Sequence, residues 1–368
     1  MKLACRALAL FLVCVGALSV AAAPDPQAAR ALAKEGRMLA LRVHLKKVAR
    51  EGALTAPAWL AYWRLILDYP EVGYDLLYAW KNVAPPGSGD NKINLLFDQA
   101  QDKALAGDFK GAAATYLHLA KALRPRLGAA RSDLRTFYPF VLQGLGRALY
   151  AMGRYEDSLR VFNGIPSSFP RYRQVVFERM WAAFRAGNID ETLGATATQR
   201  SPFFETILEP EAFLIEVYLF RRLCREDDAK SSHAYVQDSE RRIRDGRWGM
   251  KEWVRRDLET SALYHLMETK TTDAEEAQEA SRIRVALEKR FASEKARLLR
   301  DFTQVRAYSR LALLPSARHL LKPIQKLPSR EQLLAQDLEI WPADSGEAWV
   351  DELGRFRFLG ESRCATTP

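Results

Sequence analysis

The sequence has little of what several protein classes require. Four cysteines in 368 residues are too few for a scaffold built on disulfides. The 20 glycines and 17 prolines are too few for a collagen-like or low-complexity chain. Charged residues make up 27% of the chain and the mean hydropathy is -0.24, which excludes a protein with many membrane-spanning helices. We therefore expect a soluble, helix-rich protein behind an N-terminal targeting segment.

Charge of one sign is not concentrated in any part of the chain. The net charge of +10 comes from 55 basic and 45 acidic residues that are spread along the sequence. A nucleic-acid-binding protein usually gathers its basic residues into a patch or a run. The sequence therefore predicts no nucleic-acid partner.

Motifs for catalysis and metal binding are also missing. There is no glycine-rich phosphate loop and no Gly-x-Ser-x-Gly nucleophile elbow. The acidic runs 226–228 and 351–352 fit a solvated turn and a tail surface better than a cation site or an acid–base pair. The five histidines stand alone, outside any His-Glu-x-x-His spacing: His44, His118, His233, His265 and His319. We therefore predict no enzymatic activity, no cofactor and no metal ion.

The N-terminus has the three parts of a signal peptide. Lys2 and Arg6 form a short basic region, residues 8–18 form an apolar run, and small residues follow up to Pro24. The run is short for a membrane helix, which needs about 20 residues. We predict a signal peptide over residues 1–21, with an uncleaved anchor as the alternative. After cleavage the chain would keep no transmembrane helix and would be exported, to the periplasm or to the outer membrane.

Cleavage would leave two cysteines, Cys224 and Cys364. An exported compartment permits a disulfide between them. Their spacing in the sequence does not show that their Cα atoms come within bridging range. Two unlinked thiols are therefore our interpretation, with a disulfide as the alternative.

The body of the chain has apolar residues at three- and four-residue spacing, which predicts α-helices. The clearest unit runs from Leu145 to Phe162 and resembles a tetratricopeptide repeat. Gly146 lets the second helix of the unit approach the first, and Gly153 ends the first helix in a conformation with positive φ. Ser158 stands where the repeat usually has alanine.

Similar turns recur on both sides of this unit. Gly107 lies in the upstream turn, and Gly187 lies in the downstream turn, 34 residues after Gly153, which is the length of one tetratricopeptide repeat. Cys224 stands where a fourth turn glycine would be. An unrelated helical bundle with coincident small residues is the alternative.

The fold class is therefore predicted as all-α: a tetratricopeptide-like α-solenoid, a right-handed superhelix of helix pairs, followed by a C-terminal long-helix bundle and an irregular tail. Between Trp248 and Leu313 we expect a long antiparallel pair of helices that packs on the end of the array. The aromatic residues between Trp59 and Trp80 have helical spacing, so we expect them in a core rather than on a ligand-binding surface. The predicted divisions are a signal peptide (1–21), an N-terminal helical region (22–90), a repeat array (91–244), a long-helix region (245–326) and a C-terminal tail (327–368).

The tail carries the sharpest resemblance to a known family. Together with the repeats and the signal peptide, it resembles the exported tetratricopeptide-repeat proteins of deltaproteobacteria, some of which are assigned to adventurous gliding motility. Ser345 is inserted relative to their pattern, and Ala348 stands where an aromatic residue is expected. The resemblance implies a scaffold of the cell envelope without chemistry of its own. The matching residues are Trp341, Pro342, Asp344, Gly346, Glu347, Trp349, Asp351, Glu352, Leu353, Gly354 and Cys364.

In a repeat solenoid, the first helix of each pair lines the concave face. Arginine beside aromatic residues on that face would suit a peptide segment with a carboxylate, through charge-assisted hydrogen bonds and ring contacts. The alternative is that these are ordinary solvated or inter-repeat residues. The registers set by the turn glycines place six predicted groove residues there: Gln143, Arg147, Tyr150, Trp181, Phe184 and Arg185.

Two functions follow as hypotheses. The first is a non-enzymatic periplasmic or envelope scaffold that holds other envelope proteins or their peptide segments in its groove, in a motility or envelope complex. The second is an accessory binding protein of cell-wall metabolism, whose groove binds peptidoglycan or a hydrolase. The family resemblance favours the first hypothesis.

Overall fold

The computed structural model describes most of the chain after residue 24. Two sets of predictions fall outside the described residues: the signal peptide 1–21, and the tail motif 341–354. The described residues are 25–51, 54–73, 75–76, 80, 89–127, 132–201, 204, 208–256, 258–335 and 356–364.

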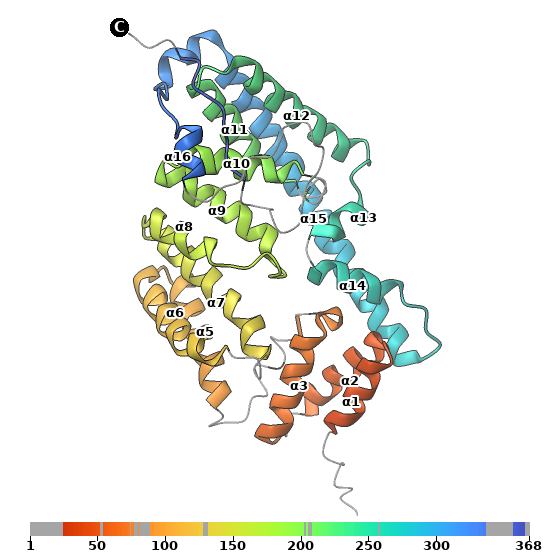
Figure 1. The fold of residues 1–368 in the computed structure, drawn as a ribbon. Helices are drawn as coiled ribbons and strands as arrows, with labels where there is room; N and C mark the ends of the chain where they lie inside the picture. The colour runs from red at the N-terminus through yellow and green to blue at the C-terminus, as the bar shows by residue number, and fades with distance from the viewer. Residues whose placement is uncertain are drawn as a thin grey trace, which may run out of the picture.

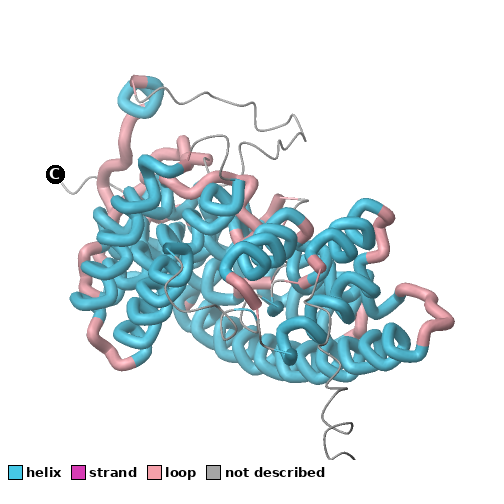
Figure 2. Tube along the Cα trace, turned by 90° about the horizontal axis from the view of Figure 1, so that it is seen from below, coloured by secondary structure: helices cyan, strands magenta, loops and turns pink. Residues whose placement is uncertain are grey.

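Over these ranges the chain forms helices and their connections and contains no β-strand (Figure 2), which confirms the predicted all-α class. No helix of the described part is both long and apolar enough to cross a membrane. In chain order, the α-helices with described bounds begin with α1 (Pro26–Lys34), α2 (Met38–Glu51), α3 (Ala56–Asp68), α5 (Gly89–Leu105), α6 (Phe109–Leu123), α7 (Ser132–Ala151), α8 (Tyr155–Asn163), α9 (Tyr172–Ala186), α10 (Ile189–Gln199), α11 (Pro210–Arg222) and α12 (Glu226–Arg244). Then come α13 (Met250–Trp253), α14 (Leu258–Glu268), α15 (Ala274–Leu313) and α16 (Arg330–Leu334), with 3₁₀ turns at Pro70–Val72, Arg124–Arg126, Val254–Arg256 and Pro315–Leu320.

Each helix from α5 to α12 packs against the next one in the chain, and the turns inside the pairs share one geometry. Gly107, Gly153 and Gly187 have φ values of 81°, 76° and 84°, which glycine adopts without strain. In each turn the glycine N–H donates to the carbonyl three residues back, and the next N–H donates to the carbonyl five residues back, at 2.8 to 3.2 Å. These bonds satisfy the last carbonyls of the first helix. The three predicted turns are confirmed.

Cys224 takes the same place between α11 and α12. Its φ of 57° is the one positive value among the non-glycine residues of the described ranges, and such a value is uncommon for any residue with a Cβ. Its N–H donates to Arg221 O at 3.1 Å, and the N–H of Arg225 donates to Phe220 O at 2.8 Å. Cys224 therefore replaces the turn glycine of a fourth helix pair.

The N-terminal aromatic residues form a core, as predicted, wherever the structure describes them. Trp59, Tyr62 and Trp80 are completely buried. The rings of Trp59 and Trp63 stack with their centroids 5.2 Å apart, and the Trp59 indole N–H donates to the backbone oxygen of Trp80 at 3.0 Å. These rings fix α3 against α2 and the segment that follows it.

Helix α15 joins parts of the chain that are far apart in sequence. Its 40 residues extend about 60 Å at 1.5 Å per residue. It packs against α11, α12 and α14, and its first turns also reach α2 (Figure 1). Ile283, Leu287 and Phe302 of α15 share one buried core with Leu39 of α2 and Phe213 of α11. The last long helix therefore returns to the first helices of the chain.

One expectation for this region is wrong. We expected two long antiparallel helices between Trp248 and Leu313, but α15 alone is long, and α13 and α14 are short. Residues 269–273 have no regular secondary structure before α15. Three of them are threonines, which have low helix propensity, and Asp273 then caps α15 by accepting the N–H of Glu276 at 3.0 Å. These residues divide the expected pair into unequal helices.

Our expectation of two unlinked thiols is also wrong. A disulfide joins Cys224 to Cys364, with Cα atoms 4.9 Å apart. The bond forms because residues 356–364 turn back onto the α11–α12 connection. The two cysteines are 140 positions apart in the sequence, so patterns in the local sequence do not reveal this return.

Candidate functional site

The predicted groove residues lie on two neighbouring helices. Figure 1 shows α7 and α9 toward the middle of the molecule, with α6 and α8 along its outer edge. Spacings of three and four residues place three of the six along one face of α7, and the other three along one face of α9. Helix α7 also contacts α9 directly. The structure therefore brings the six predicted residues together, with Gln143 buried and the other five at least partly exposed.

A carboxylate that the sequence did not single out joins the two helices. Glu178 of α9 accepts hydrogen bonds from Arg147 Nε at 3.0 Å and from Arg147 Nη2 at 2.5 Å. The side-chain amide of Gln143 donates to the same carboxylate at 3.2 Å. Gln143 is buried, whereas the Arg147 side chain is 47% exposed. Glu178 already holds the position that a ligand carboxylate would take on Arg147.

Arg185 is also engaged within the surface. Its guanidinium lies over the Tyr155 ring, 4.6 Å from the centroid, and donates to the Tyr155 hydroxyl. The Tyr155 ring meets Tyr150 edge to face at a centroid distance of 5.3 Å. Burial raises the pKa of the Tyr150 hydroxyl, so this group remains a hydrogen-bond donor in neutral solution.

Aromatic rings continue this surface toward the next helix pair. Trp181 and Phe184 meet edge to face with centroids 5.9 Å apart, and Phe184 meets Tyr218 of α11 at 6.0 Å. The Arg222 guanidinium lies over the Tyr218 ring at 5.4 Å. The three rings are half-buried. A partner would therefore meet aromatic faces and arginines whose charges are already engaged.

Two hollows open on this surface, one on each side of Arg147. The first has a volume of about 290 Å³, and its walls are Tyr150, Phe162 and Trp181 together with the Arg147–Glu178 pair. Apart from that pair its walls are aromatic, so it suits an apolar side chain.

The second hollow lies between α5, α6 and α7 and has a volume of about 330 Å³. Phe97, Tyr116 and Phe140 line it, and burial raises the pKa of Tyr116 to about 12. Leu105 and Phe109 stand at its edge, 87% and 37% exposed. Exposed apolar residues beside a hollow are a common mark of an interaction surface.

A larger hollow, of about 880 Å³, lies far from these helices. It is bounded by the α1–α2 turn and the connection from α14 to α15. Arg37 and Glu276 bridge it with a 3.4 Å ion pair, in which Arg37 is more than half exposed. Its walls mix threonines, charged groups and backbone from two segments that are far apart in sequence and meet there. We interpret this hollow as a gap between the α1–α2 turn and the α14–α15 connection, and not as part of the groove.

The described ranges offer little catalytic geometry. They contain no group of three His, Cys, Asp or Glu side chains that could hold a metal ion. His233 Nδ1 lies 2.6 Å from Ser309 Oγ, the one feature that resembles a nucleophile and its base. Ser309 is completely buried, and the other ring nitrogen contacts Gln237 at 3.1 Å instead of a carboxylate. A substrate could not reach this pair as it stands.

Searches of protein-family models, curated proteins and solved structures find no match for this chain. The six predicted residues are together, and the two that sequence reasoning missed are Glu178 and Tyr155. Glu178 comes three residues before Trp181, a spacing that places both on one helix face, and this could have indicated it.

Proposed function

We propose that this chain is a tetratricopeptide-like solenoid that acts as a non-enzymatic scaffold in the cell envelope, with a peptide segment of another envelope protein bound along α7 and α9. The observation that carries the proposal is the aromatic surface with a hollow on each side of Arg147. The four turns of one geometry, at three glycines and Cys224, support the repeat interpretation. The disulfide is consistent with an oxidising, exported compartment.

The surface favours an apolar anchor over an anionic one. Arg147 is paired with Glu178 and Arg185 is engaged by Tyr155, so a ligand carboxylate would have to displace an existing partner. An apolar or aromatic side chain can enter the 290 Å³ hollow without breaking an ion pair. The polar edge formed by Arg147 can then bond the carbonyls of the bound segment. The partner segment is therefore one with a large apolar residue between polar ones.

Photo-crosslinking in intact cells tests this proposal. A benzophenone amino acid in place of Phe184 should capture a defined envelope protein, because this half-buried ring continues the line from Trp181 to Tyr218. Trp181→Ala, made in the same chain, should lower the yield of that adduct at least tenfold, since it removes a wall of the hollow. Mass spectrometry of the adduct would identify the partner.

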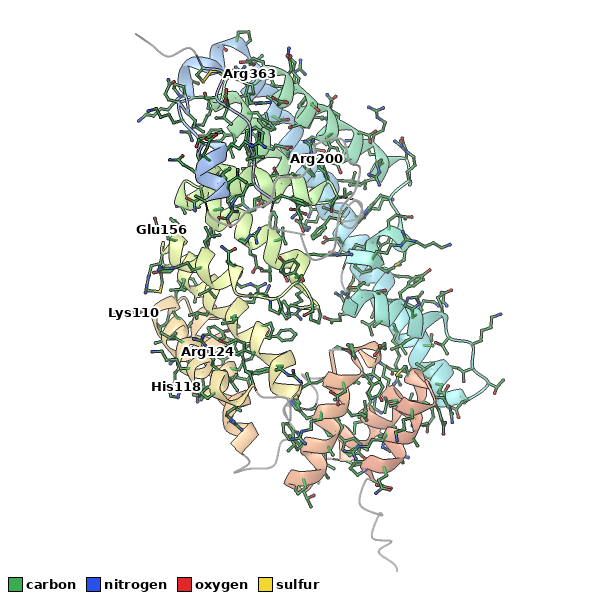
Figure 3. The ribbon with its side chains drawn as sticks, in the orientation of Figure 1. Lys110, His118, Arg124, Glu156, Arg200 and Arg363 are labelled. Atoms are coloured by element: carbon green, nitrogen blue, oxygen red, sulfur yellow. A yellow bond between two sulfur atoms is a disulfide. The ribbon has the colours of Figure 1, made fainter. Side chains whose placement is uncertain are left out.

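The matched control places the benzophenone at Glu156 on α8. Figure 3 shows Glu156 with Lys110 at the outer edge of the molecule, away from α9. This position should give no adduct with the same protein. Equal capture from both positions, or an adduct that does not respond to Trp181→Ala, would remove the groove as the binding surface.

A further inference from the structure

The C-terminal segment 356–364, which we call the tail strap, lies in an extended conformation across α10 and the end of α11 (Figure 1). Its backbone bonds to both elements. The N–H of Phe358 donates to Asp190 O at 3.0 Å, and the N–H of Arg363 donates to Leu223 O at 2.8 Å. Figure 3 shows Arg363 at the top of the molecule. The strap is thus bound as an extended peptide ligand would be.

The surface below the strap is shaped for a main chain to cross it. Gly194 lies inside α10, where glycine is less favourable than alanine. A Cβ at Gly194 would lie 1.8 Å from the carbonyl oxygen of Phe356. Any larger residue at this position would therefore collide with the backbone of the strap.

The charges below the strap match its arginine. Arg357 Nε lies 3.4 Å from Asp190 Oδ2, and Arg357 Nη2 lies 3.1 Å from Glu191 Oε2. Both acidic side chains are almost buried, at 12% and 6% exposed. Glu191 also pairs with Arg179 at 3.7 Å, and together with Asp190 it favours a basic side chain at this point of a bound segment.

The next residue of the strap fills an aromatic position. The Phe358 ring meets Phe220 of α11 at a centroid distance of 5.7 Å. The Arg225 guanidinium also lies over the Phe358 ring, 5.2 Å from the ring centroid. The surface therefore recognises arginine followed by an aromatic residue, with the backbone passing over Gly194.

The disulfide controls whether the strap can leave. Cys224 and Cys364 are half-buried, so a dithiol reductant can attack one sulfur and form a mixed disulfide. Its second thiol then completes the exchange, and two electrons and two protons pass to the protein. The products are the two cysteine thiols and the oxidised reductant. After this step only non-covalent contacts hold the strap.

We propose that the surface made by Asp190, Glu191, Gly194, Phe220 and Arg225 is a second interaction site, for a partner's extended segment containing arginine followed by an aromatic residue. The Cys224–Cys364 disulfide keeps the chain's own strap in this site. Reduction of the disulfide by a dithiol opens the site to the partner. This surface is separate from the α7–α9 groove, and its test does not depend on that groove.

The test uses the full chain and a fluorescent peptide with the sequence of residues 356–362, which contains no cysteine. Binding is followed by fluorescence anisotropy with the protein oxidised and after treatment with dithiothreitol. Oxidised protein should not bind the peptide. Reduced protein should bind it, and the reduced double variant Arg357→Glu, Phe358→Ala should bind at least tenfold more tightly, because its own strap no longer competes.

Two controls address specificity and folding. Gly194→Val should abolish binding in the reduced double variant, and circular dichroism must show that this chain keeps its helices. A peptide with glutamate in place of its arginine needs no change in the protein and should not bind. Equal binding before and after reduction, binding of the glutamate peptide, or no binding to the reduced double variant would each overturn the proposal.

Discussion

At the scale of single residues, the close approach of α7 and α8 depends on Gly146. A Cβ at this position would lie 2.6 Å from Cε1 of Phe162, which is almost completely buried and cannot move away at low cost. Ser158, also buried, donates its hydroxyl to the carbonyl of Gly146 at 2.8 Å. Ser158 thus adds a hydrogen bond between the two helices.

We expect Gly146→Leu to lower the free energy of unfolding by about 1–3 kcal/mol through overpacking against Phe162. Chemical denaturation followed by circular dichroism measures this change. Gly164→Ala is the matched control, because a Cβ there meets its nearest neighbour at an ordinary 3.4 Å and its φ of -82° suits any residue. Equal stability of the Gly146 variant and the wild type would show that the two helices do not meet as described.

His233 makes the stability of the fold depend on pH. Burial, with help from Arg306 and Arg310, lowers the pKa of His233 below its ordinary value of 6.5. The unfolded chain therefore binds a proton at a higher pH than the folded chain, and stability is lost as pH falls from 6.5 through the folded pKa. We expect the Tm to decrease between pH 7.5 and pH 5.5 for this reason.

The histidine contribution is isolated by comparison with His233→Asn, whose amide can still reach Ser309 as Nδ1 does. The Tm of this variant should decrease less over the same pH range. Other groups, including His44, whose pKa burial also lowers, titrate equally in both proteins. A parallel decrease in the two proteins would contradict the assignment to His233.

Residue patterns in the sequence predict the local features well and the cross-helix contacts poorly. The turn glycines, and Cys224 in place of one, follow from a conformation that only few residues adopt easily. The Arg147–Glu178 pair depends on how α7 and α9 are aligned, which no spacing within one helix determines. The six groove residues could therefore be placed on one face, but not the carboxylate that neutralises Arg147.

At the scale of elements, α10 shows why a helix can be misjudged from its own sequence. It is buried on almost every side, including its threonines and its acidic residues Asp190 and Glu191. The tail strap covers the side that other helices leave open. Small residues such as Gly194 and Ala195 suit this position, but the residues that require them come about 160 positions later.

The contact between α2 and α15 is held by a buried ionic cluster. Arg42 donates to Glu279 at 2.9 Å and to Asp75 at 2.7 Å, and Lys46 donates to Glu279 at 2.8 Å. Arg42 and Glu279 are 4% and 5% exposed. Burial by itself would raise the pKa of Glu279, but the hydrogen bonds from Lys46 and Arg42 outweigh it and hold the pKa below its usual value.

We expect Glu279→Ala to destabilise the protein by about 3 kcal/mol, the lower end for breaking a buried pair, because Asp75 still faces Arg42. Denaturant titration measures the loss. Glu268→Ala serves as control, since its partner Arg284 is 3.8 Å away and both side chains are half exposed. That change should stay within about 0.5 kcal/mol. Similar losses in the two variants would mean that the cluster does not anchor α15.

At the scale of the whole molecule, α15 makes this protein different from an open array of repeats. In an open array each repeat contacts only its neighbours, so distant repeats unfold nearly independently. Here one helix packs against α2 near the start of the chain and against α11 and α12, the last of the sequentially packed helices. The amphipathic pattern predicts that α15 exists, but not that it reaches α2, since this contact spans more than 230 residues between Arg42 and Glu279.

This closure leads to a prediction about cooperativity. Hydrogen exchange, followed by mass spectrometry, should give the slowest amides of α2 and of α11 the same opening free energy, because neither can separate from α15 without exposing the core they share. Glu279→Ala breaks the anchor at α2 alone, so it should lower the opening free energy of α2 and leave that of α11 near the wild-type value. The anchor would then be what couples the two ends. If α2 and α11 already differ in the wild type, the ends open independently and α15 contributes contacts without coupling them.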